Sequence, residues 1–427
     1  TESSSLEEFA NSGRFDRVIN ATGKIVAPGS IEMHTHGFGR KEFMNITPQD
    51  LDDILKSYAE YGVTSVSPTI VTDNMGNIKK TLEVIAKSHE DYETTQNDEN
   101  CEPRANLVGI YLECRYFNDT PKRGAQNPNE FVNNIQKYKE KYPDCKRDNL
   151  TQIILDEIAD FDSKDGAKGF IKIIAIDPSL EGAPTLVKIL ESKRYKIAIG
   201  HSDCTIEQAR KAIKNGATIL VHAYNCISME REYAGERSVD NSGTKNGFGE
   251  CVDSKEVYAE IVADFVHVKK CYVTMLKDRK EIEHIILITD ASALAGSKEK
   301  ECTLGKKRVI VKEINGHKAA YYEDNTLCGS VLTMNQAIKN AVEAGYLLNE
   351  AFRMASLNPA KALGVDNKRG SLSKDKYADI VIYERGYLKD KTSKISDNTI
   401  GRTLCTLIEG NIAYKSDSLF GSLIGFG

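Results

Sequence analysis

Histidine and carboxylate residues recur at the ends of short apolar segments in this sequence. His34 and His36 stand two residues apart in the segment IEMHTH. In an extended strand such residues project from one face, so both imidazoles can reach a single cation. Imidazole and carboxylate groups are the ligands that Zn²⁺ and similar first-row ions prefer. A set of residues after other apolar segments completes the predicted metal centre: Glu113, His201, His222 and Asp290.

A centre of this kind can hydrolyse a substrate if one coordination position stays open for water. A bound metal lowers the pKa of water from about 15.7 to about 7, which supplies hydroxide at neutral pH. We predict that Asp290 accepts the proton and later delivers it to the leaving amine. Zn²⁺ is the expected ion, Fe²⁺, Co²⁺ and Mn²⁺ are alternatives, and one or two ions per subunit are possible. A single histidine at a strand end is usually structural, but the whole set favours ligands.

The apolar segments alternate with segments of helical periodicity, which is typical of a parallel sheet built from βα units. Eight such units close a (β/α)8 TIM-like barrel, and barrel enzymes carry their catalytic groups at the C-terminal ends of the strands. The fold class is therefore predicted to be α/β. The expected strands are the segment ending at His36 and residues 64–72, 106–113, 171–177, 195–202, 218–225, 260–268 and 284–292.

Further segments are predicted around the strands. Three have helical apolar spacing, and an Asn-Gly pair at 315–316 indicates a hairpin after the eighth strand. This hairpin is followed by two predicted helices, at 330–345 and 348–364, and then by two predicted strands, at 378–384 and 403–415. We predict a small β-sandwich domain from residues 1–29 and 370–427, and a catalytic barrel domain from residues 30–369. The three helical segments are 51–62, 205–216 and 271–282.

Composition excludes several classes of partner. The formal net charge is −5 and the basic residues are dispersed, so no basic surface for nucleic acid is expected. No apolar run approaches the roughly 18 residues that span a bilayer, and the first residues lack a signal-peptide pattern. The ten cysteines form no CxxC pair, so free thiols are expected. These features predict a cytoplasmic protein without a membrane partner.

The sequence resembles the N-acetylglucosamine-6-phosphate deacetylases of the amidohydrolase superfamily. The motifs that carry the resemblance include PGSIEMHTHG at 28–37, GATILVHAYN at 216–225, VADFVHV at 262–268 and ITDAS at 288–292. The resemblance implies a cytoplasmic homodimer that hydrolyses the N-acetyl group of N-acetyl-D-glucosamine 6-phosphate to acetate and glucosamine 6-phosphate.

The resemblance also implies roles for single residues. Glu113, His201 and His222 would be the primary metal ligands, His34 and His36 would bind a second ion, and Asp290 would be the acid and base. His267 would polarise the acetyl carbonyl or position the sugar. The remaining substrate-binding residues would be Gln126, Asn225, Cys226, Arg231 and Cys328, of which Asn225, Cys226 and Arg231 would face the phosphate.

The sequence departs from the family pattern near the substrate. Arg115 follows the ligand Glu113 closely, Gln126 replaces a substrate-contacting histidine, and Phe265 stands where glycine is common. Two alternatives therefore remain: a related amidohydrolase that acts on another N-acyl amino sugar or a cyclic amide, and a non-catalytic sugar-phosphate binder. The fourth strand ends in Asp177 without a lysine to carboxylate, which weakens the cyclic-amide version.

Overall fold

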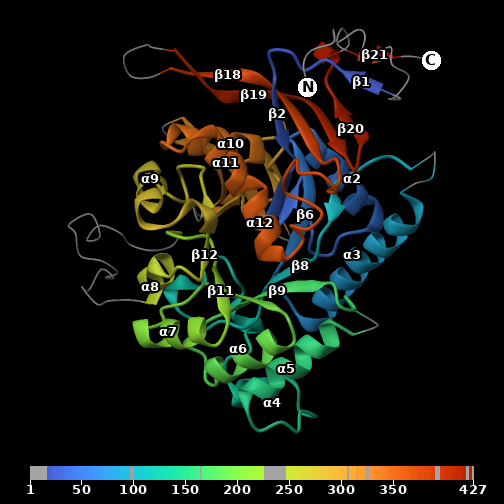
Figure 1. Cartoon of the computed structure of the whole chain (residues 1–427). Helices are drawn as coiled ribbons and strands as arrows, with labels where there is room; N and C mark the ends of the chain where they lie inside the picture. Colours follow the sequence, from blue (N-terminus) through green and yellow to red (C-terminus); the bar gives the residue numbers. More distant parts are fainter. Residues whose placement is uncertain are drawn as a thin grey trace.

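The protein folds as a barrel with antiparallel sheets attached to it. The computed structural model describes residues 17–96, 98, 101–163, 166–225, 247–304, 307–314, 316–323, 327–389, 395–419 and 423–425. Figure 1 shows helices around the barrel and, at the top of the view, a sheet that brings the two ends of the chain together.

Eight strands form the barrel, and each pairs with its neighbours in parallel. The ring closes where Thr35 and Ala291 form an isolated parallel bridge. The predicted (β/α)8 architecture is thereby confirmed. The barrel strands are β3 (Ser30–Thr35), β6 (Val63–Val71), β8 (Ile110–Glu113), β9 (Ile171–Ile176), β10 (Lys196–Ile199), β11 (Ala217–Leu220), β12 (Tyr258–Val262) and β13 (Ile285–Ile288).

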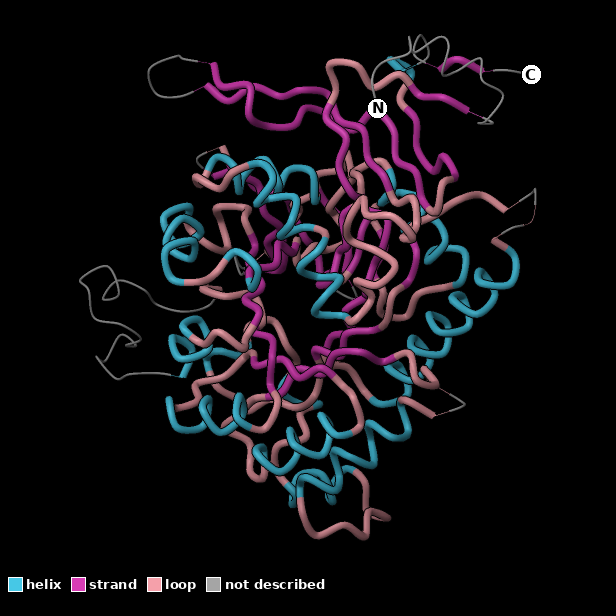
Figure 2. The backbone as a smooth tube through the Cα atoms, viewed as in Figure 1, coloured by secondary structure: helices cyan, strands magenta, loops and turns pink. Residues whose placement is uncertain are grey.

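Helices cover the outside of the strands (Figure 2). Local signals start them: Thr47 caps α2 by accepting the N–H of Asp50, and Thr205 and Gln208 form a capping box on α7. No described helix is long and apolar enough to cross a membrane. The helices are α2 (Pro48–Ala59), α3 (Met75–Thr95), α4 (Ile135–Lys141), α5 (Leu150–Phe161), α6 (Ala183–Ser192), α7 (Ile206–Lys214), α8 (Gly247–Asp253), α9 (Lys270–Arg279), α10 (Met334–Glu343), α11 (Leu348–Ala355) and α12 (Leu357–Leu363).

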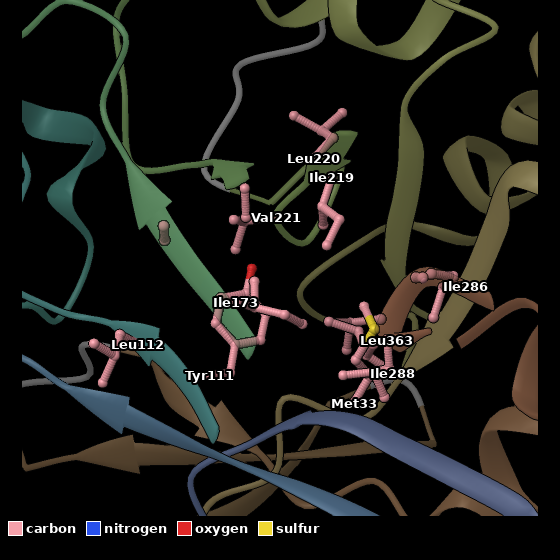
Figure 3. Close-up of a cluster of buried hydrophobic side chains, with 14 of the residues drawn as sticks. Met33, Tyr111, Leu112, Ile173, Ile219, Leu220, Val221, Ile286, Ile288 and Leu363 are labelled. Atoms are coloured by element: carbon pink, nitrogen blue, oxygen red, sulfur yellow. The ribbon is translucent and has the colours of Figure 1, made fainter. Parts of the chain in front are cut away.

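Apolar side chains from the strands form the core. Tyr111 of β8 is the register partner of Ile173 of β9, and Figure 3 shows both among the buried side chains that also include Met33 and Ile288. Such strands read as almost continuous apolar runs because both of their faces are covered. The core fixes the strand ends, and with them the residues that follow each strand.

An antiparallel sheet leaves the barrel after β13. It contains β14 (Glu301–Leu304), β15 (Lys307–Ile314), β16 (His317–Tyr322) and β17 (Leu327–Ser330). The pairing of Ile314 with His317 confirms the predicted hairpin, although Asn315 itself lies outside the described residues. Ser330 returns to the barrel through a parallel bridge to Ala291.

The two ends of the chain meet in antiparallel sheets. One sheet contains β2 (Ile25–Pro28), β18 (Ile380–Lys389), β19 (Ile395–Ile408) and β20 (Asn411–Lys415), and β1 (Arg17–Ile19) pairs with β21 (Leu423–Gly425). Thr406 donates to the carbonyl of Ala59 at 2.7 Å, which joins this sheet to the barrel. Gly62 is required there, because a Cβ atom would lie 2.3 Å from the hydroxyl of Tyr383. The domain boundaries given above remain a prediction.

Several predicted elements differ from the structure. The strands expected at 195–202, 218–225 and 284–292 end at Ile199, Leu220 and Ile288, and two further differences have a local cause. The strand expected at 260–268 ends at Val262, because the Asp264 carboxylate accepts the N–H groups of Val266 and His267 and turns the chain. The helix expected at 348–364 is divided into α11 and α12 at Ser356, whose φ and ψ are −134° and −71°. Its hydroxyl donates to the carbonyl of Phe352 at 2.6 Å.

Candidate metal centre and substrate cavity

Six of the predicted residues meet at the C-terminal end of the barrel. They form two groups of potential ligands, and within each group the ligand atoms lie within 4.8 Å of one another. Each group offers nitrogen and oxygen donors, the donor set that suits a divalent first-row cation. The residues present therefore fit one ion in each group: His34, His36 and Asp290 in the first, and Glu113, His201 and His222 in the second.

The Glu113 carboxylate lies between the two groups. Its Oε1 atom is 2.9 Å from His201 Nε2, 3.3 Å from His222 Nε2 and 3.5 Å from His34 Nε2. Its Oε2 atom is 3.4 Å from His36 Nε2. One carboxylate at the end of β8 therefore contacts ligands from both groups.

Hydrogen bonds at Nδ1 orient three of the imidazoles. His36 Nδ1 lies 3.3 Å from the carbonyl of Thr69, and His201 Nδ1 lies 3.2 Å from the carbonyl of Lys122. A carbonyl oxygen can only accept, so these nitrogens carry a proton, and Nε2 is the nitrogen that would face a bound cation. His34 follows the same pattern through the carboxylate of Glu260, and its buried Nε2 atom has no hydrogen-bond partner among the described residues.

Three ligands have left-handed backbone conformations. His201, His222 and Asp290 have φ values of 48°, 27° and 49°, and each stands two residues beyond the end of a strand, β10, β11 or β13. Residues other than glycine rarely adopt a positive φ unless the surrounding structure enforces it. The backbone thus turns at the rim of the barrel and directs these groups inward.

Charge interactions keep the carboxylates ionised. Burial alone would raise the pKa of Glu113, but His34 and His201 outweigh it and hold that pKa well below its usual value. For Asp290, burial is likewise outweighed, by His36 and His34, and the pKa falls. Burial would lower the pKa of His201, whereas the stronger effect of Glu113 raises it. Ionised carboxylates are the form that binds a cation.

His267 reaches the centre from the loop after β12. Asp264 Oδ2 lies 2.6 Å from His267 Nδ1. Burial would lower the pKa of His267, but the Asp264 carboxylate raises it. The pair fixes the ring so that Nε2 is its free nitrogen. His267 was predicted within the strand at 260–268, but it lies in the loop beyond the end of β12 at Val262.

A cavity of about 440 Å³ opens over the two ligand groups. Gln126 is held firmly in its wall, because its amide oxygen accepts the N–H of Thr72 at 2.9 Å and its amide nitrogen donates to Glu113 Oε2 at 3.2 Å. Cys226 and Arg231 lie outside the described residues. The predicted substrate-binding residues that line the cavity are Gln126, Asn225, His267 and Cys328.

Two sequence departures lie away from the cavity. The Arg115 side chain is 1% exposed and pairs with Glu157, with Nη2 to Oε1 at 2.8 Å and Nε to Oε2 at 3.1 Å. Phe265 packs edge-on against His317 at a centroid distance of 5.2 Å. Neither side chain lines the cavity, so Arg115 directs its positive charge away from it although the residue follows Glu113 closely.

Sequence reasoning missed three carboxylates around the centre. Glu260 contacts His34 directly. Glu32 is fully buried, accepts the N–H and hydroxyl of Thr289, and has its pKa raised by burial to about 8. Glu42 lines the cavity. The signal was present for Glu32 and Glu260, since each is a charged residue inside an apolar strand segment.

Known proteins are similar to this chain over most of its length. A model of the amidohydrolase family matches residues 25–413. The N-acetylgalactosamine-6-phosphate deacetylase of Escherichia coli is 29% identical over 376 residues, which cover 86% of each chain. The N-acetylglucosamine-6-phosphate deacetylase of Haemophilus influenzae is 27% identical over 375 residues, covering 87% of this chain and 85% of that protein.

Solved structures share the fold. The crystal structure of N-acetylglucosamine-6-phosphate deacetylase from Pasteurella multocida superposes with a TM-score of 0.68 at 24% identity, covering 92% of this chain and 88% of that one. A substituted form of the Mycobacterium smegmatis deacetylase, in complex with N-acetyl-D-glucosamine-6-phosphate, gives a TM-score of 0.70 at 22% identity, covering 92% and 87%.

Proposed function

The chain belongs to the amidohydrolase family, and from this we propose that it is a divalent-metal-dependent deacetylase of N-acetyl-D-glucosamine 6-phosphate. The observation that carries the proposal is the pair of ligand groups at the floor of the 440 Å³ cavity. Two relatives, whose alignments cover 86% and 87% of this chain, are named as deacetylases of N-acetylhexosamine 6-phosphates. The products would be acetate and glucosamine 6-phosphate.

The metal would be held by the two ligand groups. Glu113, His201 and His222 would hold one ion, and His34, His36 and Asp290 would hold a second. When bound, such a cation supplies Lewis acidity that lowers the pKa of water and polarises a carbonyl group. Zn²⁺ is our proposed ion, with Fe²⁺, Co²⁺ and Mn²⁺ as alternatives that metal analysis distinguishes.

Asp290 would carry the proton. Its Oδ1 atom is 3.1 Å from His36 Nε2, and its lowered pKa keeps it ionised at neutral pH. In amide hydrolysis the attacking water must lose a proton and the departing nitrogen must gain one. A single carboxylate beside both atoms serves both steps.

His267 would bind the acetyl carbonyl. Asp264 fixes its Nδ1 atom and raises its pKa, so the ring can donate from Nε2 to an oxygen that gains negative charge. Such a donor stabilises the transition state more than the substrate. Gln126, Asn225 and Cys328 line the cavity for the sugar, and Asn225, Cys226 and Arg231 would face the phosphate.

The test is acetate release from a substrate panel by the metal-loaded protein. The panel contains N-acetyl-D-glucosamine 6-phosphate, its epimer N-acetyl-D-galactosamine 6-phosphate, unphosphorylated N-acetylglucosamine and a cyclic amide. Fastest turnover of the first compound supports the proposal. Preference for the epimer or the cyclic amide would favour a related amidohydrolase, and binding without turnover at any metal loading would favour a non-catalytic sugar-phosphate binder. The family resemblance also implies a homodimer, which gel filtration of the purified protein tests.

A further inference from the structure

A buried carboxylate outside the six ligands joins the two ligand groups. Glu260 of β12 is completely buried. Its Oε2 atom lies 2.9 Å from Nδ1 of His34 and accepts the backbone N–H of His222 at 3.2 Å. We propose that Glu260 is a positioning residue that orients one ligand of each group, and that the affinity of the centre for its metal depends on it.

The contact with His34 sets the chemistry of that ring. An ionised carboxylate only accepts hydrogen bonds, so the proton of His34 stays on Nδ1 and the lone pair of Nε2 is directed at the centre. The Nε2 atom of His34 is buried and lacks a hydrogen-bond partner among the described residues, and it lies 3.5 Å from Oε1 of Glu113. A carboxylate behind an imidazole also increases the basicity of that imidazole as a ligand.

The contact with His222 acts on the backbone. His222 has a φ of 27°, which is costly for a residue with a side chain. Glu260 holds this turn from two sides, because its carboxylate accepts the N–H of His222 and its backbone carbonyl accepts the N–H of Ala223 at 2.7 Å. Removing the carboxylate therefore loosens a ligand of the second group as well.

A matched control exists on the neighbouring loop. Asp264 makes the same kind of contact, from Oδ2 to Nδ1 of His267 at 2.6 Å, but His267 belongs to neither ligand group. Substitution of Glu260 should therefore lower the metal affinity, whereas substitution of Asp264 should leave it unchanged. Both residues are buried, so burial alone does not separate them.

The inference rests on the metal centre of the proposed function, and its test uses no substrate. Wild type, Glu260→Gln and Asp264→Asn are loaded with Zn²⁺ and dialysed against increasing chelator, and retained zinc is measured by mass spectrometry. Glu260→Gln should lose half of its zinc at a chelator level about 10–100-fold lower than wild type, and Asp264→Asn at the wild-type level. Superimposed curves for Glu260→Gln and wild type, or an equal loss in Asp264→Asn, would overturn the proposal.

Thermal unfolding of the metal-free proteins separates positioning from support of the fold. Metal-free Glu260→Gln should melt close to metal-free wild type, because the weaker hydrogen bonds of the amide are offset by the removal of a buried charge. Melting well below wild type would make the role structural and overturn the inference. If Glu260→Gln fails to fold, Glu260→Asp provides the same readout: the charge is kept but withdrawn by one methylene, and unchanged zinc affinity would refute positioning. A wild type that retains zinc yet releases no acetate would refute only the proposed substrate.

Discussion

Replacing Glu157 by Gln should destabilise the protein without disturbing the metal centre. Glu157 is 2% exposed and makes two hydrogen bonds to the guanidinium of Arg115. Arg115 Nη1 keeps its bonds to Glu130 Oε2 at 3.2 Å and to the carbonyl of Asp73 at 3.1 Å. The substitution therefore leaves a buried cation with only part of its compensation.

The magnitude follows from the burial. Removing one partner of a buried ion pair costs about 3–5 kcal/mol, and the remaining bond to Glu130 places this case at about 3 kcal/mol. An unfolding entropy of about 2.1 cal/mol/K per residue, taken over 427 residues, amounts to about 0.9 kcal/mol/K. The melting temperature should therefore fall by about 3 °C.

Circular dichroism melting and metal analysis check both parts of the prediction. The control is Asp148→Asn, because Asp148 forms a 2.7 Å pair with Lys139 but is 88% exposed, and exposed pairs contribute little. The control should melt as wild type does, and Glu157→Gln should keep its full zinc content. An unchanged melting temperature in Glu157→Gln would refute the energetic argument. Lost zinc at an unchanged melting temperature would show instead that Arg115 acts on the centre.

Three further outcomes are expected. Asp290→Asn should retain the ion held by Glu113, His201 and His222 and lose about 10²–10⁴-fold in turnover, measured as acetate release at equal zinc content; near-normal rates would assign the proton transfer to another group. Chelation should lower the melting temperature by about 3 °C, since an ion at a hundred times its Kd adds about 2.7 kcal/mol, and an unchanged melt in scanning fluorimetry would argue against a bound ion. The raised pKa of His267 adds stability below its ordinary value of about 6.5 that is lost as pH rises through the raised value. The stability advantage of wild type over Asp264→Asn in urea titrations should therefore be largest near pH 6 and shrink towards pH 9, and a constant difference would contradict this assignment.

Periodicity was sufficient to predict the barrel. Its strands are β-branched and apolar because helices and core cover both faces, and this made all eight visible in the sequence. The ends of the strands were harder to predict, because a side chain can accept hydrogen bonds from backbone N–H groups that would otherwise pair within the sheet. Asp264 does so after β12, which moved His267 from a predicted strand into a loop.

The site was predictable where residue type alone carries the chemistry. Histidines and carboxylates after several strands together indicate ligands, whereas the partners of those ligands depend on contacts between distant segments. Gln126 meets Thr72 across 54 positions, and Glu260 meets His34 across 226. Only the folded chain brings such pairs together. For Glu260, a carboxylate within an apolar strand segment was still a sequence signal of a functional role.

The left-handed backbone at His201, His222 and Asp290 limits how this enzyme could be redesigned for other ions. Asparagine, aspartate and histidine enter that conformation several times more readily than other side chains, and branched residues almost never do. Exchanging these positions for softer donors would increase the strain of about 1–3 kcal/mol that such a backbone conformation already costs. His34 lies in the extended strand β3, where any side chain fits the backbone, so a laboratory search for new metal preference should begin on that strand.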